Sequence, residues 1–299
     1  MATAVGIVDT PTAPADAVAG PPLPLGRRIE LPGRGTTFAR CVPGPSDAPT
    51  VLLLHGWLAS GGLNWFQSFG ELSGRYPIVA PDLRGHGRGI RSRRRFRLAD
   101  CADDVAALID LVGGGPVIAV GYSMGGPVAQ LLWRRHRDVV AGLVFIATSS
   151  SFVPGMRERF IFTSAMAAMA GGTRLGQQAT RLPVRAIRDR IPVDRSGRPT
   201  SMSRWAAAEM QRHHLPTVLE AGQAIGSYNA RRWVPGIDVP TACVVTTADA
   251  AIPPPAQARL AFAVPDATIH RLEDGHTACA RPGFGAPVLA AVDDVARRL

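Results

Sequence analysis

Lysine is absent from this chain of 299 residues, so all 33 basic residues are arginine. Arginine binds carboxylates and phosphates through paired hydrogen bonds, and a chain that uses only arginine could be adapted to an anionic partner. A GC-rich genome is the simpler explanation of that usage. The formal net charge of +10 still raises the question of a nucleic acid, an anionic membrane surface or an acidic substrate as partner.

Cysteine is scarce, and its four copies are scattered along the chain at Cys41, Cys101, Cys243 and Cys279. No pair has the C-x-x-C spacing, and no histidine pair has metal-ligand spacing. A disulfide framework is not expected in a chain of this length. We therefore expect no bound metal.

Long apolar runs are also missing, because no stretch reaches the 18 residues that a membrane-spanning helix needs. The first 25 residues are rich in alanine and proline and have no basic segment followed by an apolar run, which argues against a signal peptide. We expect a disordered tail over residues 1–26 and a cytoplasmic protein.

Short apolar runs alternate with amphipathic stretches through most of the chain. The alternation is typical of an α/β fold with a mostly parallel central sheet and helices on both faces. The runs predict strands at 28–31, 37–42, 51–54, 78–80, 116–120, 139–147, 241–246 and 267–272. The amphipathic stretches predict helices at 64–73, 98–112, 124–137, 255–262 and 284–299.

The alternation pauses between residues 151 and 234, where the sequence is helical or irregular and interrupted by prolines. The simplest organisation is an α/β core with an inserted helical cap. We expect the core to comprise residues 27–150 and 235–299, and the cap to comprise residues 151–234.

A nucleophile motif, Gly121-Tyr122-Ser123-Met124-Gly125, lies between a predicted strand and a predicted helix. In that setting G-x-S-x-G forms a tight turn that projects the serine hydroxyl above the sheet. The helix N-terminus beside the serine favours developing negative charge. An ordinary glycine-rich turn is the alternative, but the flanking elements favour Ser123 as a nucleophile.

Serine needs a base, and the base needs an acid to fix its tautomer. Among the seven histidines, His276 stands out because it follows the last predicted strand. Asp249 closes the strand before it, on the sheet edge where Ser123 is expected. Asp274 is the weaker candidate, because a residue two positions before the base has little room to orient it.

An oxyanion hole is predicted from His55-Gly56-Trp57, which ends an earlier strand at the same edge. The backbone N–H groups of Trp57 and Met124 would bind the developing oxyanion. His55 is better explained as a structural hydrogen-bonding residue than as a catalytic one.

Five motifs in this order resemble the α/β-hydrolase superfamily of esterases, lipases, C–C hydrolases and cofactor-free haloperoxidases. They are His55-Gly56-Trp57, Pro81–Gly87, Gly121–Gly126, Asp249 and Gly275-His276, within a resemblance that covers 28–299. Gly89 stands where the family often has serine. A nucleophilic aspartate is absent, which disfavours epoxide hydrolase and haloalkane dehalogenase activity.

The resemblance implies a serine hydrolase, with hydrolysis of a small or lipid-like carboxylic ester through an acyl-enzyme as the first expectation. That mechanism needs no cofactor. Hydrolysis of a C–C bond, or haloperoxidase and perhydrolase chemistry with the same triad, is the alternative. A non-catalytic binding protein on this fold is a weaker alternative. The oligomeric state is left open.

An uncharged stretch and two arginine clusters bear on the choice of partner. Residues 160–170 carry no charge, and they predict either a helix packed on the core or an acyl-binding wall that includes Phe160, Met166 and Met169. Arginines concentrate in the cap and at 84–97, which predicts a solvated surface or, as the alternative, peripheral contact with anionic lipid. Nucleic acid is not expected, because no recognition pattern accompanies the charge.

Overall fold

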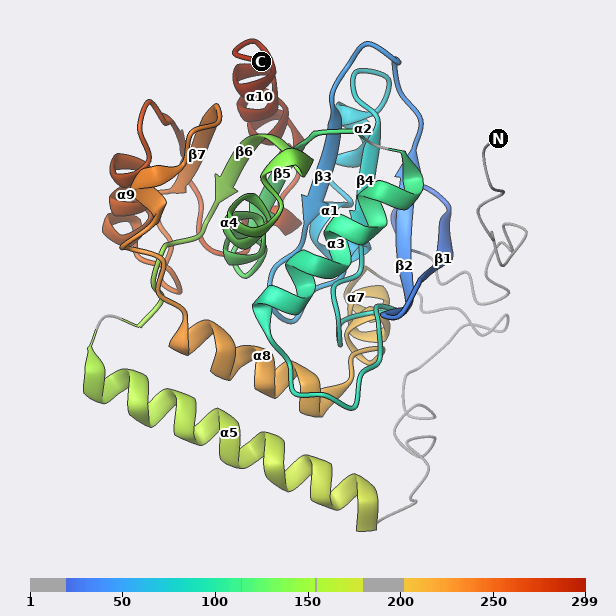
Figure 1. Cartoon of the computed structure of the whole chain (residues 1–299), viewed down its shortest axis with the longest axis vertical. Helices are drawn as coiled ribbons and strands as arrows, with labels where there is room; N and C mark the ends of the chain where they lie inside the picture. Colours follow the sequence, from blue (N-terminus) through green and yellow to red (C-terminus); the bar gives the residue numbers. More distant parts are fainter. Residues whose placement is uncertain (1–19, 114, 154, 180–201) are drawn as a thin grey trace.

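The computed structural model describes residues 20–113, 115–153, 155–179 and 202–299. Its centre is an eight-stranded sheet in the order β1-β2-β4-β3-β5-β6-β7-β8 (Figure 1). β1 pairs with β2, and β2 with β4, in antiparallel fashion, and all other pairs are parallel. The strands are β1 (Gly26–Leu31), β2 (Gly35–Val42), β3 (Thr50–Leu54), β4 (Ile78–Pro81), β5 (Val117–Tyr122), β6 (Val140–Ile146), β7 (Thr241–Thr246) and β8 (Thr268–Leu272).

Helices cover both faces of the sheet, because successive side chains of each central strand point to opposite sides. In β3, Leu52 and Leu54 pack in one core cluster and Val51 and Leu53 in the other. The first cluster lies under α3 (Leu98–Val112), α4 (Gly125–Arg135) and α9 (Pro254–Ala263), and the second under α1 (Gly61–Trp65), α2 (Phe69–Leu72) and α10 (Gly285–Ala296). Three short 3-10 helices lie at Arg137–Val139, Val234–Gly236 and Ala278–Ala280.

The predicted α/β fold class is confirmed, and most predicted elements lie within three residues of the observed bounds. One helix differs, because the expected helix at 64–73 is two short helices, α1 and α2. Ser60 caps α1 by accepting the Leu63 N–H at 3.1 Å, which places its start earlier than expected. Glycines at 61, 62 and 70 weaken any longer helix there.

Three described α-helices lie between β6 and β7: α5 (Met156–Ala179), α7 (Met202–Met210) and α8 (Leu215–Ser227). α8 packs between α5 and the α/β core, and α5 forms the outermost layer of the molecule (Figure 1). The ends of the inserted segment meet, since Ser151 forms a β-bridge with Asn229 and the Ala230 N–H donates to the Ser150 carbonyl at 2.8 Å. None of the helices in the described ranges is long and apolar enough to span a bilayer.

The expected tail over residues 1–26 is only partly testable, because residues 1–19 lie outside the described part. Its last residues correct the expectation. Leu23 packs against the second core cluster, and Gly26 already belongs to β1.

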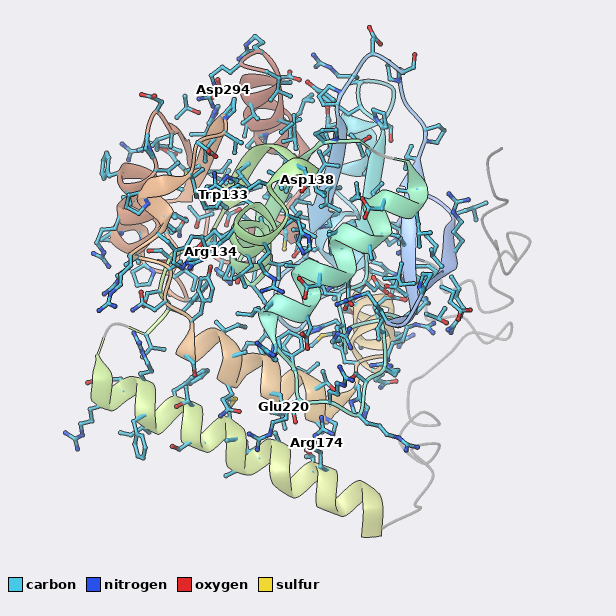
Figure 2. The ribbon with its side chains drawn as sticks, in the orientation of Figure 1. Trp133, Arg134, Asp138, Arg174, Glu220 and Asp294 are labelled. Carbon is cyan, nitrogen blue, oxygen red and sulfur yellow. The ribbon has the colours of Figure 1, made fainter. Side chains whose placement is uncertain are left out.

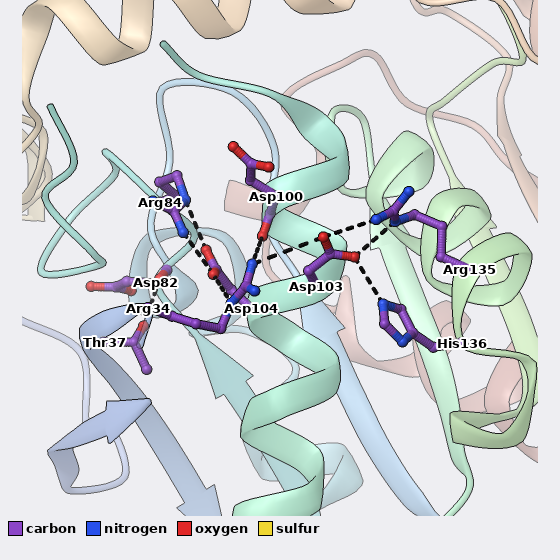
Figure 3. Close-up of polar contacts among 9 residues, drawn as sticks. All are labelled: Arg34, Thr37, Asp82, Arg84, Asp100, Asp103, Asp104, Arg135 and His136. Carbon is purple, nitrogen blue, oxygen red and sulfur yellow. Dashed lines mark hydrogen bonds and ion pairs between the residues drawn. The ribbon is translucent and has the colours of Figure 1, made fainter. Parts of the chain in front are cut away.

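A polar network fixes α3 to its neighbours (Figure 3). Asp104 accepts hydrogen bonds from Arg34 at 2.6 Å and from Arg84 at 2.7 and 2.9 Å. Asp103, one residue earlier, pairs with Arg135 and His136. Arg84 is therefore a buried structural residue, and the arginine-rich segment 84–97 is not solvated throughout.

Candidate active site

Ser123 lies at the sharp turn between β5 and α4 with a left-handed φ of 50°. Such a φ is unfavourable for a residue with a side chain, and the surroundings maintain it. The Ser123 N–H donates to the Ile146 carbonyl at 2.9 Å, and the Thr148 hydroxyl donates to the Ser123 carbonyl at 2.7 Å. Gly121 and Gly125 permit the turn, because a Cβ at either would come within 2.4 Å and 2.1 Å, respectively, of a backbone oxygen.

His276 lies in the loop after β8, with its Nε2 atom 2.9 Å from the Ser123 hydroxyl oxygen. The Tyr122 hydroxyl donates to the His276 carbonyl at 2.6 Å and holds that loop against the turn. The imidazole is therefore within hydrogen-bond reach of the serine proton.

Asp249 follows β7 and completes a chain of hydrogen bonds. One carboxylate oxygen lies 2.8 Å from Nδ1 of His276. That oxygen also accepts from the Thr246 hydroxyl and the Gln257 amide, and the other accepts the Ala251 and Ile252 N–H groups. With the Nδ1 proton directed to the carboxylate, the lone pair of Nε2 faces Ser123.

The electrostatics of Asp249 keep it ionised although its side chain is fully buried. Burial opposes ionisation, but the hydrogen bonds from His276 and the Ile252 N–H outweigh it. The pKa of this carboxyl consequently lies below its ordinary value. A buried carboxylate with several donors is a rigid, charged partner for the imidazole.

Asp274, the rival acid, has different partners. It accepts the N–H of the adjacent Gly275 at 2.7 Å and lies 3.7 Å from the Arg281 guanidinium. The hydrogen bond at Nδ1 of His276 goes to Asp249 instead.

The backbone after β3 approaches the serine. A Cβ at Gly56 would lie 3.3 Å from Cβ of Ser123, and the Gly56 N–H donates to the Asn64 side chain at 2.9 Å. Among the described residues, neither the Trp57 nor the Met124 N–H donates to another backbone group.

His55 has the structural role expected of it. Its Nδ1 atom donates to the Gly56 carbonyl at 2.8 Å, and its Nε2 atom accepts the Leu83 N–H at 2.8 Å. Complete burial lowers the pKa of His55 to about 4, so the ring is neutral at physiological pH.

The three side chains predicted to line a substrate pocket do not share one environment. Phe160 is 72% exposed and Met169 is 45% exposed, so both face away from the core, contrary to expectation. Met166 faces inward: its sulfur and the Trp57 ring both come within 3.1 Å of the Cβ position of Gly222 on α8. Burial along α5 accounts for the split: Met166 lies on the half-buried face, whereas positions 160 and 169 lie at the two edges of the exposed face.

Several supporting residues were not predicted from the sequence, among them Gln257, Thr246 and Thr148. Gln257 comes from α9 and contacts both Asp249 and Thr246 at 3.2 and 2.8 Å. Its position one helical turn inside α9 gives no sequence signal of its own. In the described part of the chain, no cluster of three or more His, Cys, Asp or Glu side chains could hold a metal ion.

A family model described as the alpha/beta hydrolase fold matches residues 49–280. The chain belongs to the α/β-hydrolase family. The match covers the β3–β8 region and therefore includes the Ser123 turn, Asp249 and His276 of this hydrolase.

Curated relatives of this α/β hydrolase differ in activity. It is 28% identical over 256 residues to the "Magnesium-chelatase 30 kDa subunit" of Rhodobacter capsulatus. This match covers 78% of this chain and 82% of that protein. It is 36% identical over 124 residues to lipase LipV of Mycobacterium tuberculosis, covering 42% of this chain and 46% of the lipase.

Among solved structures, a thermophilic esterase from Thermogutta terrifontis superimposes with a TM-score of 0.68. The superposition covers 91% of this chain and 98% of the esterase at 23% identity. At that identity the likeness bears on the fold alone.

Proposed function

We propose that this α/β hydrolase is a serine hydrolase that cleaves carboxylic esters through an acyl-enzyme. The observation that carries the proposal is the continuous chain from the Ser123 hydroxyl through His276 to the buried Asp249, at 2.9 and 2.8 Å. In that arrangement Ser123 is the nucleophile, His276 the general base and Asp249 the orienting acid. Its substrate is a small-molecule ester.

The proposed reaction begins when Ser123 attacks the ester carbonyl while Nε2 of His276 takes the hydroxyl proton. The Trp57 and Met124 N–H groups stabilise the oxyanion of the tetrahedral intermediate. The imidazolium, stabilised by Asp249, then protonates the leaving alcohol. Water activated by His276 hydrolyses the acyl-enzyme and regenerates Ser123.

C–C bond hydrolysis or perhydrolysis with the same residues is the alternative reaction, and a non-catalytic role is a third. Turnover of p-nitrophenyl esters supports ester hydrolysis, whereas phosphonylation of Ser123 by a fluorophosphonate without ester turnover would favour C–C bond hydrolysis or perhydrolysis. Failure to react with the probe would favour a binding protein.

The inserted segment 151–234 is proposed to be the cap that controls access to Ser123. Trp57, after β3, donates its indole N–H to the Val218 carbonyl of α8 at 2.8 Å. Met166 of α5 and Trp57 both approach α8 at Gly222. These apolar groups connect the cap with the loop that carries the proposed oxyanion donor, and they are suited to form the wall of an acyl pocket.

Acyl chain length should therefore matter. We expect kcat/KM for p-nitrophenyl esters to rise from acetyl upward and then level off, because each buried methylene contributes about 0.8 kcal/mol. Met166→Asp should remove this rise. Met169→Asp is the matched control, since it places the same charge on the outer face of α5 and should leave the series unchanged. A steady decline from acetyl onward in all three proteins would mean that the cap forms no acyl pocket.

Association with a magnesium chelatase is a second candidate function. The observation that favours it is the length of the Rhodobacter capsulatus match, which covers 82% of that relative, whereas the lipase match covers 46% of the lipase. We expect a tagged form of this chain to co-elute with the other subunits of that chelatase in size-exclusion chromatography. Separate elution at micromolar concentrations would contradict a stable complex.

A further inference from the structure

The outer face of α5 is apolar although it has no partner in the described structure. Its exposed residues from position 160 to 172 include no charged side chain and are Phe160, Ile161, Ser164, Ala165, Ala168, Met169, Gly171 and Gly172. Phe160 is 72% exposed and Ile161 57% exposed. Large apolar side chains gathered on one exposed helix face are typical of an interaction surface rather than of a solvated helix.

The opposite face of α5 already accounts for the packing of this helix. Ala170 is buried, and Phe162 and Thr163 approach the Cβ position of Gly226 on α8 within 3.0 Å. At the C-terminal end, Arg174 forms a paired contact with Glu220 of α8 at 2.6 and 3.0 Å (Figure 2). The outward apolar residues are therefore not required to attach α5 to the rest of the molecule.

Positive charge borders the C-terminal end of α5. A depression between α5, α8 and the segment before α3 is lined by Arg93, Arg95 and Arg174. Its one acidic residue, Glu220, is engaged by Arg174 and by the Phe96 N–H at 2.9 Å. Within the described ranges no carboxylate pairs with Arg93, Arg94 or Arg95, and all three are exposed.

We propose that the outer face of α5, together with Arg93, Arg94 and Arg95, docks on an anionic lipid surface. In this geometry α5 lies in the plane of the interface, with Phe160, Ile161 and Met169 among the acyl chains and the arginines at the phosphate level. A second copy of this chain is less suited to the surface. It carries the same net charge of +10, and on the outer face of α5 it offers one acidic residue, Glu158.

Docking through α5 would also place the proposed cap against the membrane. Because α5 rests on α8, and α8 accepts the hydrogen bond of Trp57 in the loop after β3, the inner side of the cap would face the proposed active site while its outer side faces lipid. The proposal extends the proposed hydrolase function but can be tested without it, since membrane binding needs no turnover.

Vesicle co-sedimentation of the full chain tests this proposal. We expect binding to phosphatidylcholine vesicles that contain phosphatidylglycerol, weaker binding at high salt, and little binding to phosphatidylcholine alone. Ile161→Glu should lower the partition coefficient about tenfold or more, because it removes an apolar side chain that docking would bury in the lipid and adds a negative charge. The triple variant Arg93→Gln, Arg94→Gln, Arg95→Gln should remove the preference for anionic vesicles.

Phe262→Glu is the matched control. Phe262 is 79% exposed on α9, away from α5, so the same charge change there should leave vesicle binding intact (Figure 1). Ser123→Ala should bind vesicles as the wild type does, which separates docking from hydrolysis. Equal binding by the wild type and Ile161→Glu would overturn the proposal. A dimer in light scattering that Ile161→Glu dissociates would assign the face to a second copy instead.

Discussion

Replacing Ser123 with alanine is expected to lower kcat for p-nitrophenyl esters by about three orders of magnitude or more while the fold survives. The hydroxyl is the atom that forms the acyl-enzyme, and neither His276 nor the proposed oxyanion donors can substitute for it as the attacking group. Residual turnover should be that of a site that still binds and polarises the ester. Steady-state kinetics measure the loss, and circular dichroism verifies that the chain remains folded.

Covalent labelling gives the same assignment an independent readout. Treatment with a fluorophosphonate should add one mass increment per chain, on the peptide that contains Ser123, because only this hydroxyl lies 2.9 Å from an imidazole Nε2 atom in the described structure. Ser68→Ala is the matched control: it removes a buried hydroxyl that has no hydrogen-bond partner among the described residues. It should retain both labelling and turnover. Adduct formation on another serine, or full activity in Ser123→Ala, would refute the assignment.

Much of the core could be predicted because buried parallel strands give a strong sequence signal. The run Val51–Leu54 is apolar throughout since both faces of β3 are covered, and it ends at His55-Gly56, where the chain leaves the sheet. The helix Leu98–Val112 was predicted at its observed bounds. Its apolar residues recur at helical spacing, and Gly113 adopts the left-handed conformation that ends it.

The orientation of α5 could not be predicted for a physical reason. Both of its faces are apolar, with Phe162 and Met166 on the inner face and Phe160, Ile161 and Met169 on the outer one. Hydrophobic periodicity identifies a buried face only when the other face is polar. The sequence therefore indicated an uncharged helix but not which methionine approaches Trp57.

In the proposed site, too, some residues could be predicted from the sequence and others could not. Ser123 could be located from a local motif, and Asp249 and His276 from their positions at strand ends. The groups that support them act across long sequence distances, as when the Thr148 hydroxyl binds the Ser123 carbonyl and Gln257 binds Asp249. Threonine and glutamine are common on protein surfaces, so no local pattern distinguishes these two from others.

The role of the acid leads to the second large effect. Asp249→Asn should lower kcat by about 10³–10⁴, because an asparagine amide can present its N–H₂ to Nδ1 of His276 and favour the tautomer with the proton on Nε2. That tautomer cannot accept the Ser123 proton. The loss should persist across the neutral pH range, since the pKa of Asp249 lies below its ordinary value and the wild-type carboxylate stays ionised there.

Asp274→Asn is the matched control, with the same change of one oxygen to nitrogen two residues before the base. Asp274 accepts the Gly275 N–H and lies near Arg281, and an asparagine oxygen can still accept from that N–H. Its effect on kcat should therefore be far smaller than that of Asp249→Asn. If Asp274→Asn proved the more damaging variant, the imidazolium would have to be stabilised by Asp274 or through a water molecule. The direct contact of 2.8 Å between Asp249 and His276 would then be structural rather than catalytic.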